Sequence, residues 1–340
     1  MGRIFRISLM LLTALFVCLC VGRFPMGPGD VAGLILSGLG FDNHFIVSPR
    51  DMGMVFWNIR VPRLVLTILA GAGISTAGAV FQALFRNPLA APEILGVTAG
   101  SCFGAAFAIM YLSPLAWVIQ GSAFLFGTIA VTFAYILANF SNDTSPAVLV
   151  ISGIVTSALF KAGLAFMMYL SNPHDQLTRI IFWTMGSFHT ASWTKIEITL
   201  PLLLPGIILM IIFSWRLNIM TQDTEDAMSM GINIFRWRIF FVAASTLMVA
   251  CSVACVGSIA WIGLIVPHIA RYLTGPDNRK LIPATAVLGG CFLMVMDSVA
   301  RSVTMSEIPI SIVTSIFGAP FLGYLVVNAG KKRFYNGPGH

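Results

Sequence analysis

The sequence predicts an all-α polytopic membrane protein with about ten transmembrane helices. Of its 340 residues, 57% are hydrophobic and only 10% are charged, and the mean hydropathy is +0.89. A soluble domain usually carries roughly a quarter charged residues and somewhat under half apolar ones, so no globular surface absorbs this excess. The composition excludes a disulfide-rich extracellular scaffold, a disordered chain and a nucleic-acid binder.

The helices are expected in order along the chain, as one membrane domain over 1–340. Arg3 and Arg6 precede an apolar run that resembles a signal peptide, but no small-x-small cleavage site follows Leu19, which favours a retained first helix over 1–22. Asp30–Leu39 is apolar but too short to span, which predicts an interfacial segment. The further spans are expected over 62–85, 94–112, 115–138, 147–170, 195–215, 237–256, 258–273, 281–300 and 308–330.

The charge distribution indicates topology. The 20 basic and 13 acidic residues give +7, and the basic residues lie singly between apolar runs rather than in one patch. Ten spans with the N-terminus inside place both termini in the cytoplasm. The basic residues then expected inside are Arg3, Arg6, Arg86, Arg216, Arg236, Arg238, Arg271, Arg279, Lys280, Lys331, Lys332 and Arg333, and those expected outside are Arg23, Arg50, Arg60, Arg63, Arg179, Lys195 and Arg301.

Motifs for enzymatic chemistry are missing from the sequence. There is no G-x-x-x-x-G-K-[ST] phosphate loop, so any ATPase must be another chain. The histidines are scattered without an acid cluster or a nucleophile–base set, and His268 has no second ligand at helical spacing. The cysteines lie in apolar stretches and are interpreted as packing residues. We therefore expect neither an enzyme nor a cofactor.

Two local patterns concern packing and backbone. Gly96, Gly100 and Gly104 recur at four-residue spacing, which favours close helix packing within the subunit or at a subunit interface. Phe85–Glu93 contains two prolines four residues apart, which cannot continue a helix. This segment is either a simple cytoplasmic turn or a turn at the inner mouth of a pathway that Asn87 and Leu89 narrow.

Several stretches, in order along most of the chain, resemble the permease subunit of ABC importers for iron complexes and vitamin B12, the type II importers. They are Arg60-Val61-Pro62-Arg63, Gln82 through Gly96, Trp183-Thr184-Met185-Gly186, Gly257 through Arg271, and Glu307-Ile308-Pro309. The resemblance implies a ten-helix subunit of the bacterial inner membrane that forms a homodimer around a central pathway. It also implies two cytoplasmic ATP-binding subunits and one periplasmic substrate-binding protein.

The resemblance further implies a coupling helix that docks on the ATPase, in the cytoplasmic loop of about 216–236. Early acidic residues and a final glycine suit a short helix, because the helix dipole favours negative charge at its start. The alternative is a solvated loop. The residues concerned are Asp223, Glu225, Asp226, Ala227, Met230 and Gly231.

At the other face, the resemblance implies that Arg60, Arg63 and Arg301 bind glutamates on the substrate-binding protein. A planar guanidinium suits such contacts because it can bind a carboxylate through two hydrogen bonds. For Arg301 the competing account is an ion pair within its own helix, since Asp297 lies four residues earlier.

The resemblance also implies a cytoplasmic gate, for which we consider Asn87, Pro88, Leu89, Thr144 and Ser145. The register across Pro146 leaves Thr144 and Ser145 ambiguous. Lys161 is not explained by the family pattern. A lysine inside a span usually faces a cavity, where it would meet an anionic cargo, and the alternative is snorkelling to the outer interface.

The function that follows is ATP-driven import of a metal chelate, a ferric siderophore or another iron complex. Cobalamin, haem and oxyanion importers of the same family are alternatives. An ion-coupled secondary transporter is a remote one, since it would need acids near the membrane midplane. An intramembrane enzyme is the rival from another class.

Overall fold

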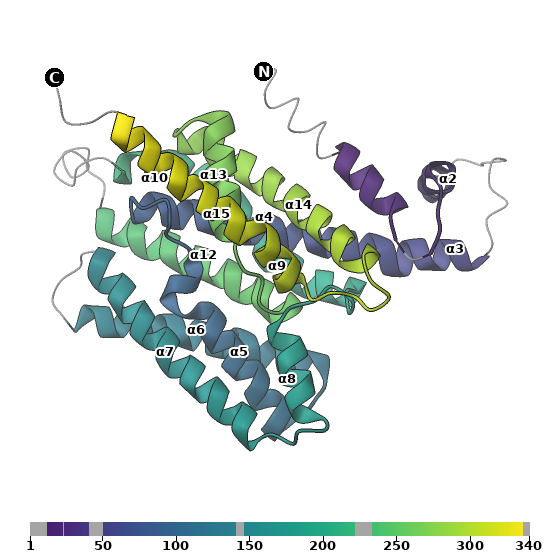
Figure 1. Cartoon of the computed structure of the whole chain (residues 1–340), viewed down its shortest axis with the longest axis horizontal. Helices are drawn as coiled ribbons and strands as arrows, with labels where there is room; N and C mark the ends of the chain where they lie inside the picture. The colour runs from purple at the N-terminus through teal and green to yellow at the C-terminus, as the bar shows by residue number, and fades with distance from the viewer. Residues whose placement is uncertain (1–11, 23, 41–49, 141–145, 222–232, 336–340) are drawn as a thin grey trace.

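The computed structural model describes residues 12–22, 24–40, 50–140, 146–221 and 233–335. Every regular element in these ranges is helical, which confirms the all-α fold class (Figure 1). Each of the ten predicted spans contains helix. In the described ranges, six helices are long and apolar enough to cross a membrane, and Val97–Leu112 and Ile310–Tyr324 are shorter apolar helices.

The elements run in chain order through one bundle. After a helix over 12–20 come α2 (Pro28–Gly38), α3 (Arg50–Val55), a π-helical turn (Phe56–Arg60), α4 (Val61–Leu84), a 3₁₀ turn (Pro92–Leu95), α5 (Val97–Phe107) with a π-helical end (Ala108–Leu112), α6 (Ala116–Asn139), α7 (Pro146–Leu170), α8 (Gln176–Thr184), α9 (Trp193–Ile212), α10 (Ser214–Met220), α12 (Ile234–Val256), α13 (Ile262–Thr274), α14 (Asn278–Ser302) and α15 (Ile310–Tyr335).

Helix α4 is the centre of the bundle and is buried along almost its whole length. Small residues allow its neighbours to approach its backbone. A Cβ atom on Gly71 would lie 2.3 Å from the carbonyl oxygen of Gly289 in α14, and one on Gly78 would lie 1.9 Å from that of Gly263 in α13. Such contacts matter in a membrane because lipid supplies no hydrophobic force between helices.

In the predicted span 94–112, the glycines at four-residue spacing pack within the subunit. A Cβ atom on Gly100 would lie 2.5 Å from the carbonyl oxygen of Phe126, and one on Gly104 would lie 2.5 Å from that of Ser122, both in α6. Gly96 has another function, because its φ of +84° is the left-handed conformation that separates the 3₁₀ turn from α5.

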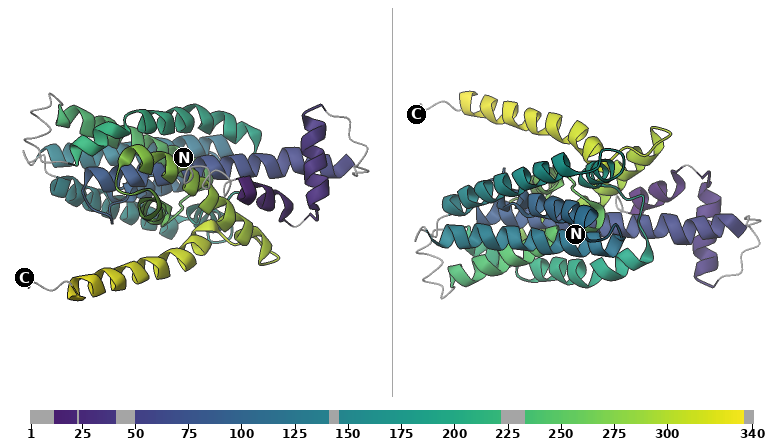
Figure 2. Two further views of the ribbon diagram at one scale, coloured as in Figure 1. Left: turned by 90° about the horizontal axis from the view of Figure 1, so that it is seen from above. Right: turned by 90° about the horizontal axis from the view of Figure 1, so that it is seen from below.

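Two predicted spans are not continuous helices. The block 94–112 is divided at Gly96 and ends in a π-helical turn, because Pro92 and the left-handed Gly96 interrupt the helical hydrogen bonds. In the block 258–273, residues 257–260 are irregular and Trp261 has a φ of +74°, so α13 begins only at Ile262. The predicted interfacial segment is α2, which crosses the α3–α4 helix near its start (Figure 2).

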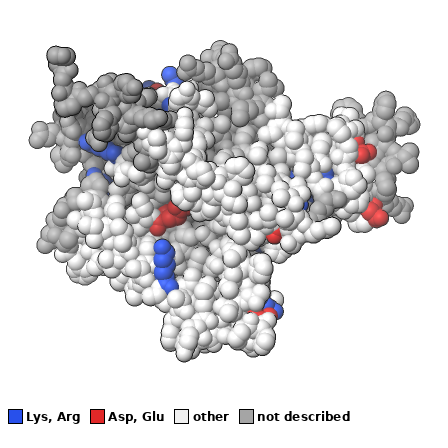
Figure 3. All heavy atoms as spheres, in the orientation of Figure 1, with Lys and Arg blue, Asp and Glu red and all other residues white. Residues whose placement is uncertain are grey.

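The outer surface suits a bilayer. Figure 3 shows a face on which the described charged side chains are few and scattered. Helix α15 diverges from the rest of the bundle toward its C-terminal end (Figure 2). We call the end of the bundle where α4 and α9 begin and α12 and α14 end the arginine end, because Arg60, Arg63 and Arg301 lie there, and the other end the opposite end.

Candidate functional site

At the arginine end, Arg63 joins three segments that are distant in the sequence. It lies in the first turn of α4 and is 8% exposed. Its Nε donates to Asp297 Oδ2 at 3.0 Å and its Nη2 donates to Asp297 Oδ1 at 2.9 Å. Its Nη1 and Nη2 also donate to Glu307, at 2.8 and 2.9 Å. One guanidinium therefore fixes α4 against α14 and against the segment that precedes α15.

The other two arginines bind carbonyls at the end of the helix over 12–20 and, for Arg60, just beyond it. Arg60 donates to the carbonyls of Leu19 and Phe24 and, at 3.4 Å, to that of Cys20. Arg301 donates to the Cys18 carbonyl at 2.6 Å. The last carbonyls of a helix have no partner within the helix, and a cation there also interacts favourably with the helix dipole.

The structure thus brings together the three predicted docking arginines and gives each an intrachain partner. The competing account for Arg301 is met only in part, because its Nε lies 3.8 Å from Asp297 and makes no hydrogen bond, whereas Arg63 binds the same carboxylate at hydrogen-bond distance. Docking to a binding protein stays a prediction, with the guanidinium groups already positioned by the chain.

Three loops that carry the motifs meet beside this cluster. Ser187 N donates to the Val256 carbonyl at 2.8 Å, and Ile310 N donates to the Gly186 carbonyl at 3.1 Å. Ser311 Oγ binds the Ser258 carbonyl at 2.9 Å. A side chain on Gly257 would lie 2.4 Å from the Trp183 carbonyl oxygen, so the crossing requires glycine.

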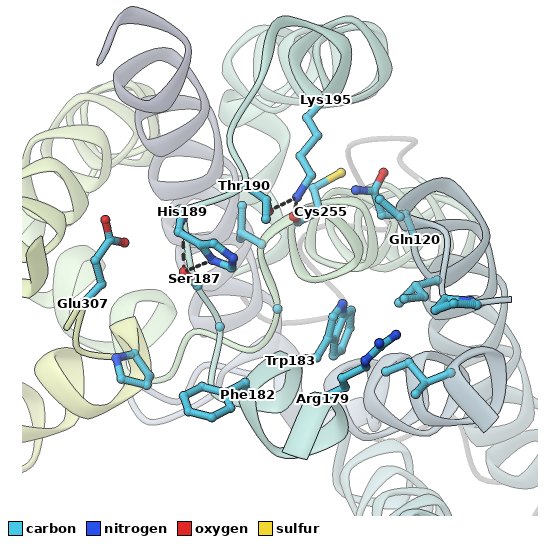
Figure 4. A pocket seen from close by; sticks show the side chains of 18 residues that line it. Gln120, Arg179, Phe182, Trp183, Ser187, His189, Thr190, Lys195, Cys255 and Glu307 are labelled. Atoms are coloured by element: carbon cyan, nitrogen blue, oxygen red, sulfur yellow. Dashed lines mark hydrogen bonds between the residues drawn. The ribbon is translucent and has the colours of Figure 1, made fainter. Parts of the chain in front are cut away.

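Above this crossing lies a cavity of about 800 Å³, which we call the α8 pocket (Figure 4). Lys195 and Arg179 extend into it from opposite sides, Gln120 lies near Cys255 on the Lys195 side, and Glu307 lies across the pocket from Gln120. Its remaining lining residues are Ile109, Pro114, Ala116, Ile119, Phe182, Trp183, Gly186, Ser187, His189, Thr190, Cys255, Val256, Gly257 and Pro309.

The polar groups of this pocket were not selected from the sequence. Lys195 Nζ donates to Thr190 Oγ1 at 2.6 Å and to the Cys255 carbonyl at 3.0 Å. Ser187 Oγ and His189 Nδ1 are 2.8 Å apart. The sequence offered only an extra basic residue expected outside and a lone histidine, and neither signal indicates a shared cavity.

At the opposite end, the predicted gate segment forms a compact turn. Asn87 Oδ1 accepts a hydrogen bond from Leu89 N at 2.9 Å, Pro88 lies between them, and all three residues are exposed. Arg86 has a φ of +47° and reaches the Met220 carbonyl at 3.5 Å. Burial raises the pKa of the Glu93 carboxyl in the following 3₁₀ turn to about 7.

Other predicted residues lie elsewhere. Lys161 is exposed on α7 and does not line the α8 pocket. The coupling residues Asp223, Glu225, Asp226, Ala227, Met230 and Gly231, and the gate residues Thr144 and Ser145, are outside the described residues. Among the residues described, no group of three or more His, Cys, Asp or Glu side chains could hold a metal ion.

The helix before the predicted coupling segment is anchored. Asn218 in α10 donates through Nδ2 to Asp277 Oδ1 at 2.7 Å, and its Oδ1 accepts from Asn278 N at 2.8 Å. These bonds fix α10 to the start of α14. The bond from Asn218, together with one from the Arg279 backbone N–H, holds the pKa of the Asp277 carboxyl below its usual range. Helix α10 is therefore tied to the start of α14, which carries Asp297 near its other end.

Known proteins resemble the chain along nearly its full length. Residues 10–328 match the FecCD transport family. The molybdate import system permease protein MolB of Haemophilus influenzae is 36% identical over 327 residues, which cover 95% of this chain and 94% of MolB. The cobalamin import system permease protein BtuC of Halobacterium salinarum is 35% identical over 278 residues, 82% of this chain and 74% of BtuC.

The backbone resembles a solved structure described as a metal-chelate type ABC transporter in an inward-facing conformation. The two superpose with a TM-score of 0.85 at 33% identity, over 95% of this chain and 98% of that chain. The fold, the motif-bearing loops and the sequence agree. The chain belongs to the FecCD transport family and is an ABC importer permease, a transport subunit rather than an enzyme.

Proposed function

We propose that this permease carries a metal chelate, a ferric siderophore or another iron complex, across the bacterial inner membrane. Two copies form a homodimer around a central pathway, with two copies of a cytoplasmic ATP-binding subunit and one periplasmic substrate-binding protein. The observation that carries the proposal is the TM-score of 0.85 to a metal-chelate type ABC transporter over 95% of the chain.

An oxyanion is the second candidate cargo. The 36% identity to a molybdate import permease supports it, and the 35% identity to a cobalamin permease keeps cobalamin, like haem, an alternative within the family. Selection among these cargoes would belong mainly to the binding protein, because the permease offers few charged side chains along its spans.

We place the arginine end at the periplasm and the opposite end, with both termini, at the cytoplasm. The excess of basic residues expected inside supports this orientation. The opposite end also has an aromatic anchor: the Arg216 guanidinium lies 3.9 Å from the centroid of the Trp237 ring. Such basic and aromatic pairs are typical of the interface where a span leaves the bilayer.

Docking of the binding protein is proposed for Arg60, Arg63 and Arg301. Their convergence at one end supports a shared surface. Each guanidinium has five N–H donors, and Arg301 uses Nη2 for the bonds to Cys18 and Ser298. Glutamates of the binding protein would then meet guanidinium groups that already bind carbonyls or, for Arg63, the carboxylates of Asp297 and Glu307. This partial satisfaction favours reversible binding.

Coupling and gating are proposed for the opposite end. The segment 216–236 would dock on the ATPase, and the anchored Asn218 supports transmission of its movement to α14. The exposed turn at Asn87, Pro88 and Leu89 would narrow the pathway when two copies associate, together with Thr144 and Ser145.

Lys161 is proposed to face the pathway and to attract anionic cargo. Its exposure on α7 supports access from outside the protomer. Reduced uptake of an anionic cargo by Lys161→Ala would support this function, and unchanged uptake would contradict it.

Secondary transport has less support. It would require an ion-coupling acid near the midplane. Asp297, which is buried on α14, is bound by Arg63 near the end of that helix. An enzyme would be favoured only if the purified chain catalysed a reaction without partner proteins.

The assembly can be tested by co-expressing the chain with its ATPase and purifying both in lipid nanodiscs. We expect a mass of two permeases and two ATPases, and loss of the ATPase when 222–232 is replaced by a Gly/Ser linker of equal length. The same replacement of 41–49 is the control. A permease that purifies alone, or binds the ATPase equally well without 222–232, would contradict the proposal.

A further inference from the structure

We propose that the α8 pocket is a cargo-binding site for an anionic group, and that Lys195 is its principal ligand. The pocket measures about 800 Å³, which is within the usual range for sites that enclose a small organic molecule. The inference rests on the proposed transport function and deepens it, since it assigns a charge class to the cargo and a place where the permease receives it.

The ammonium group of Lys195 has a donor to spare. A protonated lysine has three N–H donors, and two of them bind Thr190 Oγ1 and the Cys255 carbonyl. These two bonds hold Nζ at the pocket wall (Figure 4). Among the described residues no carboxylate forms a salt bridge with Lys195, so its positive charge is available to a ligand.

A second group supports the same assignment independently. Gln120 is 9% exposed and lines the pocket from α6, yet no described residue forms a hydrogen bond with its carboxamide. The carboxamide atoms are not sealed in the core but border the open space of the pocket. The carboxamide lies on the Lys195–Cys255 side of the pocket (Figure 4), where its N–H groups could bind an oxygen of the cargo.

The remaining lining residues favour a negatively charged ligand. Arg179 lies at the rim, where its Nε is 2.8 Å from Asp175 Oδ1 in an ion pair. His189 contacts Ser187 through Nδ1, which leaves Nε2 as a further donor or acceptor. The acidic lining residue, Glu307, already accepts two hydrogen bonds from Arg63. An anion therefore meets donors of Lys195, Gln120 and His189. The two carboxylates at the pocket, Glu307 and the Asp175 paired with Arg179, are each bound by an arginine.

The size and the apolar walls indicate the rest of the ligand. Phe182, Trp183 and Ile119 line the pocket together with the polar groups, so it offers contacts for carbon as well as for oxygen. A tetrahedral oxyanion would occupy a small part of the volume. A metal chelate that bears carboxylates would contact both the apolar and the polar lining. An oxyanion and a chelate can be distinguished experimentally.

The first experiment measures the potential in the pocket without any cargo. In a Cys255→Ala background, which removes the native thiol of the pocket, Phe182, which is 60% exposed, is replaced by cysteine in the permease–ATPase complex in nanodiscs. The rates of modification by an anionic and a cationic methanethiosulfonate of similar size are then compared. Phe182→Cys with Lys195→Met should show an anionic-to-cationic rate ratio about three- to tenfold lower than Phe182→Cys alone. Lys280→Met, an exposed lysine at the opposite end, is the matched control.

The second experiment measures binding of ferric citrate, molybdate and cobalamin to the same complex. We expect ferric citrate affinity to fall at least tenfold in Lys195→Met and in Gln120→Leu, and to recover within about threefold in Lys195→Arg. Thr190→Val, which removes only the lysine–hydroxyl bond, separates loss of charge from loss of packing. Molybdate that displaces ferric citrate at similar concentration would assign the site to oxyanions instead of chelates.

An unchanged rate ratio, or equal ferric citrate affinity in the wild type and Lys195→Met, overturns the inference. The inference is also overturned if the rate ratio falls as expected but the variants bind anionic cargo as tightly as the wild type. These results would leave ATP-driven uptake intact. Conversely, failure of the complex to transport any cargo with ATP would refute the proposed function while the thiol rate ratio still reported on the pocket.

Discussion

Arg63 and Asp297 form a doubly hydrogen-bonded ion pair across 234 positions of sequence, with donor–acceptor distances of 2.9 and 3.0 Å. Both residues are buried, at 8% and 4% exposure. Because Arg63 also binds Glu307, the pair fixes the start of α4 to the end of α14 and to the entry of α15. The same arginine is proposed to meet the binding protein, so docking and helix packing would be linked through one side chain.

Removing this arginine should destabilise the fold. Arg63→Ala leaves Asp297 buried without its main partner, and breaking a buried ion pair in this way costs about 3–5 kcal/mol. Thermal unfolding in detergent measures the loss. Adding Asp297→Asn to Arg63→Ala should recover part of it, because the second change removes the unpaired charge. If Arg63→Ala unfolds at the wild-type temperature, the pair contributes nothing to stability.

Charge reversal at the arginine cluster should separate docking from stability. Arg301→Glu and Arg60→Glu should each weaken binding of the substrate-binding protein at least tenfold, because a guanidinium–carboxylate attraction becomes repulsion. Affinity is measured on nanodiscs, with circular dichroism to verify folding. Lys280→Glu reverses one charge at the opposite end and should bind normally. Folded variants that bind the partner as tightly as the wild type would exclude docking through these residues.

Alanine at Gly78 should prevent α4 from packing against α13. In a helix, glycine to alanine is normally favourable by about 1 kcal/mol, but the added carbon would lie 1.9 Å from the Gly263 carbonyl oxygen. Folded yield measured by size-exclusion chromatography should therefore fall sharply. Gly121→Ala in α6, where nothing lies within 4 Å of the new atom, should be neutral or stabilising. Equal yields from the two variants would contradict the close approach.

Glu93 should make stability depend on pH near neutrality. Its pKa in the folded protein is about 7, above the value of about 4.3 for an unfolded chain. The folded state therefore binds more protons between these values, and stability falls as pH rises from about 4.5 through 7. Unfolding temperatures of Glu93→Gln, compared with the wild type from pH 5 to 8, should show a growing advantage for the variant. A constant difference would show that Glu93 ionises normally.

The sequence was sufficient to predict the helices but not their partners. Apolar blocks of about 20 residues predict spans directly, and all ten contain helix in the described residues. The breaks at Gly96 and Trp261 depend on tertiary contacts that periodicity does not encode. For Asp297 the sequence favoured Arg301, since four-residue spacing is visible locally, whereas Arg63 becomes its partner only when α4 and α14 pack.

The candidate site was likewise only partly predictable from the sequence. Family resemblance selected the arginines, which converge, and the Asn87–Leu89 segment, which forms an exposed turn; docking and gating by these residues stay predictions. The α8 pocket was missed because Gln120 of α6 is far in the sequence from His189 and Lys195, and the three residues form no spaced motif. Their common feature, donors without acidic partners around one cavity, exists only in three dimensions.

The central claim is tested most directly by uptake into proteoliposomes that contain this permease and its ATPase, with the binding protein outside and ATP inside. We predict accumulation of a radiolabelled iron chelate that requires both ATP and the binding protein, and that stops when the coupling segment 222–232 is replaced. Accumulation driven by a proton or sodium gradient without ATP would contradict the account.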